Sequence, residues 1–210
     1  FSLADIGTLA MLGVSLKEQG IFGRYPEEKQ RYYVKAPAFS FLKLRGMDAY
    51  LSPEMKSTGE AIGYDKKLHR AAYKALTASG LDLKNYGTVL VSVADEDKPE
   101  TIPLIRRFWN MGFRIEATSL TGETLNSNGI PAKILRKPGE GSEEVLESIR
   151  SGHVSYVINT RAILSGVHYE DGAVIRRCAV QNGVTTFTSL DTVRILLDVL
   201  EATVDRKSVV

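Results

Sequence analysis

The chain has 210 residues, of which 43% are hydrophobic and 25% charged, as is typical of a soluble globular protein of one or two domains. Its 27 basic and 25 acidic side chains leave a net charge of +2, which gives no electrostatic basis for binding nucleic acid or a membrane surface. No apolar run approaches the roughly 20 residues that span a bilayer, and no secretory signal is recognisable. The single cysteine, Cys178, rules out an internal disulfide and fits a cytoplasmic compartment. Because the chain opens on Phe1 without an initiating Met, we expect a fragment of a longer protein.

Residues 1–81 predict a small α+β segment. Residues 3–19 predict a helix that ends at Gly20, and an extended region punctuated by proline follows it. Residues 57–60 have the spacing of a capping box, although the apolar alternation after Glu60 equally suits a strand. Asp65 can cap a further helix. The apolar positions of that helix recur every three or four residues and predict one buried face, formed by Leu68, Ala71, Ala72, Ala75 and Leu76.

The polar segment 82–87 is a candidate domain boundary, and residues 87–204 predict a second domain. Residues 88–93 form a nearly continuous apolar run, which is typical of a strand buried on both faces of a parallel sheet. Four more strands are predicted at 113–117, 132–135, 154–158 and 184–187. Helices are predicted after each strand, at 99–110, 121–128, 143–151, 171–182 and from Leu190 onward. Five β–α units in a row indicate an α/β fold, an open parallel five-stranded sheet with helices on both faces.

Ligands of such sheets bind beyond the carboxyl ends of the strands. The predicted strands are followed there by two lysines, several hydroxyls, an amide and a helix that begins at Thr121. Ammonium groups, hydroxyls and free backbone N–H groups suit a phosphate or a carboxylate. Alternatively, Thr118 and Thr121 only cap the helix, and the lysines are solvated.

Other polar residues give weaker signals. His69, His153 and His168 are scattered without ligand spacing, so we expect no metal site, and no glycine-rich phosphate loop is present. Arg176 and Arg177 are expected on a solvent-facing side of a helix. Cys178 follows apolar residues and is expected to be a core thiol rather than a nucleophile.

Several motifs resemble one family in the same order along the chain. PEMKSTGE at 53–60, with LGVSL at 12–16 and VKAP at 34–37 before it, is similar to the end of the second ATP-grasp unit in carbamoyl-phosphate synthetase large subunits. YVINT at 156–160 and VIRR at 174–177 resemble the regulatory domain of that family, which has a methylglyoxal-synthase-like fold. The resemblance covers residues 3–202.

The resemblance implies a regulatory fragment of a glutamine-hydrolysing ligase. The whole subunit would make carbamoyl phosphate for pyrimidine and arginine biosynthesis from bicarbonate, ATP and ammonia that a small glutaminase subunit releases. ATP and its Mg or Mn would be held by carboxylates upstream of Phe1, so the fragment would have no catalytic residue, metal or cofactor of its own. An effector such as UMP, IMP or ornithine would bind the second domain. The positions that match the effector's phosphate site are Lys98, Thr118, Thr121, Lys137, Asn159 and Thr160.

Two departures from the family leave the effector open. The nucleotide-regulated members have Thr-His-Gly-Thr where this chain has Thr118 to Thr121, and a small hydroxyl residue where Arg161 stands. Two other functions are therefore considered. A free-standing methylglyoxal synthase would need a carboxylate base and a histidine beside the phosphate, for which Glu140 and His168 are the nearest candidates. A docking domain would bind no small molecule.

Overall fold

The computed structural model describes residues 2–23, 30–40, 48–50, 55–160 and 169–207. The chain forms two compact units, residues 1–31 and residues 32–210. The first unit contains α1 (Leu3–Met11). Ser2 is its N-cap, and the Ser2 hydroxyl accepts a hydrogen bond from the Asp5 N–H. The prediction of a helix as far as residue 19 is wrong beyond Met11. The chain turns at Gly13, which has a φ of 93° that a residue with a Cβ rarely adopts.

The second unit starts with an antiparallel hairpin and a helix. β1 (Tyr32–Ala38) pairs with β2 (Gly59–Asp65), so the strand alternative after Glu60 is correct and the capping box is not. α2 (Leu68–Ala78) covers one face of the hairpin. It buries Ala71, Ala72, Ala75 and Leu76 as predicted, whereas Leu68 is exposed.

Asp65 does not cap α2. The helix begins after Lys67, which makes no capping bond through its side chain. The Asp65 carboxylate instead lies 2.8 Å from Lys74 Nζ, and the hydrogen bond from this ammonium, with one from the Lys67 N–H, lowers the pKa of Asp65 to about 2.

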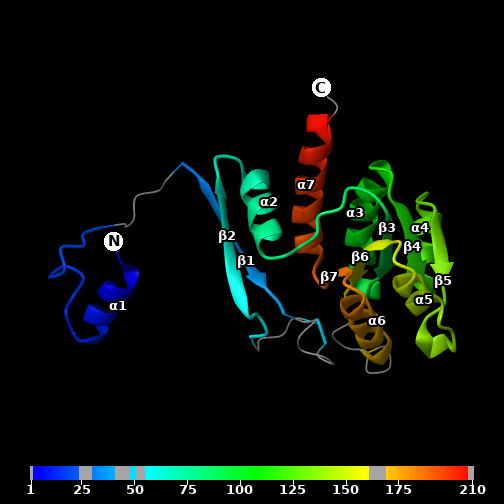
Figure 1. The fold of residues 1–210 in the computed structure, drawn as a ribbon, viewed down its shortest axis with the longest axis horizontal. Coiled ribbons are helices and arrows are strands. Elements are labelled where there is room, and N and C mark those ends of the chain that lie inside the picture. The colour runs from blue at the N-terminus through cyan, green and yellow to red at the C-terminus, as the bar shows by residue number, and fades with distance from the viewer. Residues whose placement is uncertain (1, 24–29, 41–47, 51–54, 161–168, 208–210) are drawn as a thin grey trace. The chain divides into compact units, whose positions relative to one another are not determined.

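A five-stranded parallel sheet follows, as predicted (Figure 1). Its strands lie in the order β5-β4-β3-β6-β7, with β3 at the centre. Their bounds are β3 (Thr88–Ser92), β4 (Arg114–Thr118), β5 (Ala132–Leu135), β6 (Val154–Asn159) and β7 (Thr185–Phe187). Every residue of β3 is buried, which agrees with the apolar run from which the strand was predicted.

A helix follows each strand. Their bounds are α3 (Lys98–Asn110), α4 (Ser119–Ser127), α5 (Glu144–Arg150), α6 (Tyr169–Gln181) and α7 (Leu190–Lys207). Two short 3-10 turns, η1 (Asp95–Asp97) and η2 (Pro138–Glu140), precede α3 and α5. α4 begins two residues earlier than predicted, so Thr121 lies within its first turn. None of the described helices is long and apolar enough to cross a membrane.

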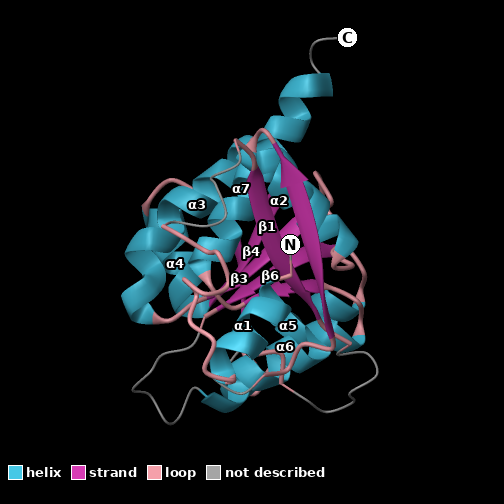
Figure 2. Cartoon of the chain, turned by 90° about the vertical axis from the view of Figure 1, so that its left-hand side faces the viewer, coloured by secondary structure: helices cyan, strands magenta, loops and turns pink. Residues whose placement is uncertain are grey.

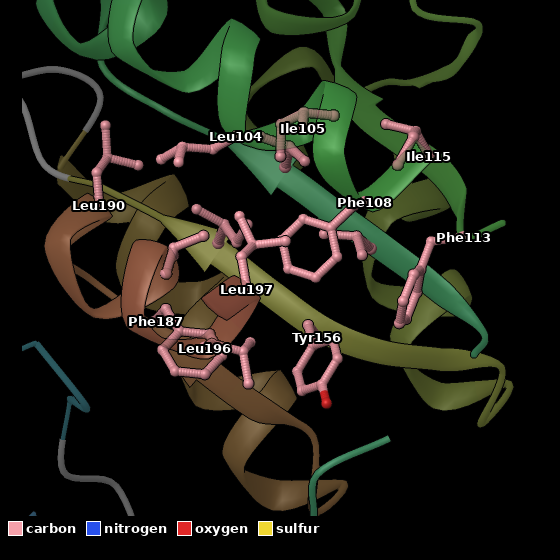
Figure 3. Close-up of a cluster of buried hydrophobic side chains, with 14 of the residues drawn as sticks. Leu104, Ile105, Phe108, Phe113, Ile115, Tyr156, Phe187, Leu190, Leu196 and Leu197 are labelled. Atoms are coloured by element: carbon pink, nitrogen blue, oxygen red, sulfur yellow. The ribbon is translucent and has the colours of Figure 1, made fainter. Parts of the chain in front are cut away.

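Helices cover both faces of the sheet. In Figure 2 they surround the strands. On one face, side chains of α3 and α7 pack with Tyr156 and Phe187 of the sheet (Figure 3), and Leu125 of α4 belongs to the same cluster. Phe108 meets Phe113 edge to face at 5.2 Å, and Tyr156 lies 6.0 Å from both rings. On the other face, α5 and α6 pack against Leu90 and Val157. Both faces of the central strands are therefore dry.

The segment that joins α2 to β3 is held by side chains of β6. Ser155 Oγ donates to the Tyr86 carbonyl at 2.8 Å, and Tyr156 Oη donates to the Lys84 carbonyl at 2.6 Å. Burial raises the pKa of Tyr156 to about 12. A third apolar cluster joins α2 to α7 through Ala75, Leu76 and Val199. The domain boundary at 82–87 stays a prediction.

The packing of α2 on the hairpin can be tested at Gly63. A Cβ there would lie 2.1 Å from the Ala71 carbonyl oxygen and 2.5 Å from the Ala75 nitrogen, both backbone atoms that cannot rotate away. We expect Gly63→Ala to lower the free energy of unfolding by about 1–3 kcal/mol or more, measured in urea. Gly59→Ala, in the same strand, is the control, since its Cβ would meet only the Ala38 Cβ at 3.9 Å. Equal stabilities would contradict the packing.

The boundary can be tested by expressing residues 87–204 alone. The clusters on both faces of the sheet lie mainly within this fragment, so we expect it to fold. Its free energy of unfolding should be lower than that of the whole chain, because Val199 loses its contacts with α2. Exposure of Val199 alone should cost about 1.5–3 kcal/mol. Limited proteolysis of the whole chain should cut near Lys84. A circular dichroism spectrum of an unfolded fragment would show that the boundary is misplaced.

Candidate functional site

The carboxyl end of β3 is the centre of the candidate site. The Val93 N–H donates to Thr121 Oγ1 at 3.4 Å, and the Ala94 N–H donates to Thr160 Oγ1 at 3.0 Å. Thr121 comes from α4 on one side of β3, and Thr160 follows β6 on the other. The structure therefore brings the two predicted threonines together around the end of one strand.

Two more predicted residues complete what we call the strand-end cluster, which comprises Ser92, Thr118, Thr121, Asn159 and Thr160. Thr118 Oγ1 donates to Ser92 Oγ at 3.2 Å, and Asn159 Nδ2 donates to the Ser92 carbonyl at 2.9 Å. Thr118 and Asn159 are almost completely buried. Ser92 was not predicted as a site residue, although its place as the last residue of the central strand was a usable signal.

The hypothesis that Thr118 and Thr121 only cap α4 is not supported. Thr118 stands at the N-cap position with extended backbone, but its side chain makes no capping bond. Thr121 lies inside the first turn and turns its hydroxyl to β3. The first N–H groups of a helix lack partners within the helix, so the N-terminus of α4 presents such donors at this edge of the sheet.

The two lysines stand at the same edge with acidic neighbours. Lys98 begins α3, its side chain is only 17% exposed, and its Nζ lies 2.7 Å from Asp95 Oδ1. Lys137 follows β5, and its N–H donates to Glu140 Oε2, which also accepts from Ser119 Oγ at 2.9 Å. The described contacts of the Lys98 ammonium run to Asp95 rather than to the strand-end cluster.

A carboxylate that the sequence analysis did not identify lies beside η2. Asp171, in the first turn of α6, accepts a hydrogen bond from the Gly139 N–H at 2.8 Å. A Cβ on Gly139 would lie 2.5 Å from Asp171 Oδ2, so glycine permits this approach. Glu140 and Asp171 thus stand on neighbouring segments at the carboxyl edge.

Arg176 was wrongly expected on a solvent-facing side of α6. It is 1% exposed, whereas its neighbour Arg177 is exposed. The guanidinium donates to Asn159 Oδ1 and to both carboxylate oxygens of Asp48. Two adjacent arginines do not by themselves indicate which of them is buried. The positions of the surrounding apolar residues on the helix are needed to decide which arginine faces the sheet.

The histidines take no part in the strand-end cluster among the described residues. His153 lies beside Glu116 and Ser148, near the start of β6. His168 lies outside the described residues, as does Arg161. In the part of the chain that the structure describes, no three His, Cys, Asp or Glu side chains form a metal-binding group. Cys178 is buried as expected, and burial raises the pKa of its thiol.

Part of the chain is similar to known proteins. Residues 100–188 match the family model of the MGS-like domain. A crystal structure of methylglyoxal synthase from Elizabethkingia anophelis NUHP1 is 17% identical, with a TM-score of 0.48 over 55% of this chain and 79% of that one. The crystal structure of ForH is also 17% identical, with a TM-score of 0.45 over 56% of this chain and 81% of that one. The region matched by the MGS-like model contains Thr118, Thr121, Lys137, Asn159 and Thr160, whereas Lys98 lies just before it.

A separate cavity of about 330 Å³ lies elsewhere in the second unit. Its lining comes from β1, the end of α2, β7 and the start of α7, and includes Ala36, Leu76, Thr186 and Ser189. None of the described residues that line it is charged, and none of them belongs to the strand-end cluster.

The hydrogen bond that fixes the end of β3 can be tested at Thr160. Thr160→Val keeps the shape of the side chain but leaves the Ala94 N–H without its acceptor. We expect a loss of about 1–3 kcal/mol in stability and faster hydrogen exchange at Ala94, measured by NMR. Thr186→Val is the control, because its hydroxyl donates to the nearby Val184 carbonyl and not to the end of β3. Unchanged exchange at Ala94 would contradict the geometry.

Proposed function

We propose that the chain is the C-terminal part of a carbamoyl-phosphate synthetase large subunit and that its MGS-like domain binds a phosphate-bearing effector. The motif at residues 53–60 and the order of the motifs along the chain support this assignment of the parent protein. The MGS-like match and the parallel sheet support the domain. The effector would be a nucleotide of the UMP or IMP kind.

One observation carries the binding proposal, namely the direction of the hydrogen bonds at Thr121 and Thr160. Each hydroxyl oxygen accepts a backbone N–H from the end of β3. A hydroxyl that accepts can still donate its own proton, and among the described residues neither has an acceptor for it. Two hydroxyl donors therefore stand at the end of β3, and one of them, Thr121, lies in the first turn of α4. Donors at a helix N-terminus favour a phosphate.

In the whole subunit this domain would regulate an ATP-dependent ligase. The ligase would use ATP with Mg or Mn, bicarbonate and ammonia delivered from a small glutaminase subunit in the cytoplasm. Residues 1–81 would be the end of the second ATP-grasp unit, and the fragment by itself would have no ATPase or synthetase activity. ATP turnover by the purified chain, absent from a mock purification, would contradict this.

A methylglyoxal synthase is the second candidate. The carboxylates of Glu140 and Asp171 at the carboxyl edge favour it, because that reaction needs a carboxylate base. Incubation with dihydroxyacetone phosphate separates the two candidates. Formation of methylglyoxal above the level of a Glu140→Gln, Asp171→Asn double variant would favour the enzyme over the regulatory domain.

The main test is a thermal-shift screen with UMP, IMP and ornithine, with inorganic phosphate as the minimal anion. We expect a nucleotide to raise the Tm, since a ligand that binds only the folded state stabilises it. A shift with UMP or IMP but not with uridine or inosine would show that the phosphate is recognised. No shift with any of these ligands would favour a docking domain that binds no small molecule.

The lysines should contribute to binding rather than to folding. A charge-assisted hydrogen bond contributes roughly 1.5–3 kcal/mol, so Lys98→Ala or Lys137→Ala should weaken binding of the identified nucleotide about tenfold to a hundredfold. Stability should change little, and raised salt should weaken binding. Isothermal titration calorimetry measures the affinity. Lys133→Ala, on the exposed face of β5, is the matched control. Unchanged affinity in both site variants would exclude this site.

A further inference from the structure

Arg176 is a charged side chain in a position from which water is excluded. It lies on α6 and is among the largest fully buried side chains that the structure describes. A buried guanidinium is stable only when its N–H groups and its charge are paired. The identity and position of its partners are therefore part of what allows α6 to pack on the sheet.

The partners of Arg176 come from two distant parts of the chain. Nε and Nη2 donate to the two carboxylate oxygens of Asp48 at 2.7 and 2.6 Å, a two-pronged pair. Nη1 donates to Asn159 Oδ1. The Tyr50 ring lies 5.5 Å from the guanidinium carbon, within the range of a cation–π contact. Arg176 thus joins residues 48–50 directly to the strand-end cluster.

The contact with Arg176 decides how the Asn159 amide is oriented. Because Oδ1 accepts from the guanidinium, Nδ2 is directed to the Ser92 carbonyl, at 2.9 Å. Ser92 Oγ in turn accepts from Thr118. An unbroken series of hydrogen bonds runs from Asp48 through Arg176 and Asn159 to the end of β3 and the start of α4.

The far end of this series is anchored to the motif at 53–60. Lys56 Nζ donates to the Tyr50 carbonyl at 2.6 Å. Burial would raise the pKa of Asp48, but the hydrogen bonds from Arg176 and from the Tyr50 N–H outweigh it and lower the pKa, so Asp48 is ionised near neutral pH. The carboxylate is only partly exposed, which limits its screening by water.

There is no spare room where α6 passes the contact. A Cβ on Gly172 would lie 2.9 Å from Arg176 Nη1 and 3.2 Å from Asn159 Oδ1. Glycine at this position lets the helix backbone approach the two polar groups closely.

We propose that Arg176 is a positioning residue that couples the strand-end cluster to residues 48–50 and 55–58, so that occupation of the cluster and the placement of these residues depend on each other. The proposal rests on the proposed function, because it assigns a route for the regulatory signal. A ligand that displaces or reorients Asn159 changes the partner of Arg176, and through it the contact to Asp48. By thermodynamic linkage, the factor by which the ligand shifts the equilibrium of the Asp48–Arg176 contact is also the factor by which forming this contact changes the affinity for the ligand.

The first test needs no ligand. Asp48→Asn in the whole chain should speed hydrogen exchange of the Val93 and Ala94 amides about tenfold, a local change of the size typical of coupled sites. Asp65→Asn is the matched control, since it removes an exposed carboxylate that pairs with Lys74 in the same unit. Exchange at the two amides that is the same in both variants would overturn the proposal. If Asp48→Asn does not fold, Gly172→Ala perturbs the same contact without removing a charge.

The second test uses UMP and inorganic phosphate as probes. In the wild type, UMP should slow exchange of residues 55–58, and Asp48→Asn should abolish this while weakening affinity about tenfold. In a double-mutant cycle, Asp48→Asn and Asn159→Ala should be non-additive for UMP affinity, whereas Asp65→Asn and Asn159→Ala should be additive. A merely structural Arg176 would lower stability but leave both cycles additive. If neither probe binds the wild type, the proposed function fails, and the first test still decides the coupling.

Discussion

β3 is the central strand of the sheet, and its last peptide groups leave the ladder in a region where both faces are covered by helices. A buried N–H without an acceptor costs about as much as a lost hydrogen bond, so the end of this strand needs partners from its neighbours. Thr121 and Thr160 supply them from opposite sides. The same requirement that completes the fold therefore gathers hydroxyls from β4–α4 and β6 at one point.

This explains why a structural and a binding role are compatible at these threonines. A threonine that donated to the backbone would have no proton left for a ligand, but both of these accept. Thr118 is different, because its proton goes to Ser92 and the Ser92 hydroxyl becomes the next donor in line. In the proposed site, the hydroxyls that could donate to an anion would then be those of Ser92, Thr121 and Thr160 rather than that of Thr118.

Much of the second unit follows from sequence pattern, because buried parallel strands are short apolar runs and each is followed by a helix with one apolar face. α1 was overestimated, since Gly13 can occur within a helix and the positive φ that ends this one is not visible in a pattern. The site was located by strand order, which places Thr118, Asn159 and Thr160 at one edge. Arg176 and Asp48 could not be predicted, because 128 positions separate them and only tertiary packing makes the burial of one depend on the other.

The acidic residues at the carboxyl edge would compete with an anion for the donors there. Asp95, Glu140 and Asp171 all stand near the predicted donors, and each already accepts a hydrogen bond or pairs with a cation. The Lys98 pair is the easiest to exchange, because the Asp95 side chain is 79% exposed and a pair of this kind contributes at most about 1 kcal/mol. A phosphate with two charges would compete with Asp95 for the Lys98 ammonium. Asp171 holds a backbone N–H of η2, so displacing it would also move Gly139, and a ligand that reaches this far would reshape the loop between β5 and α5.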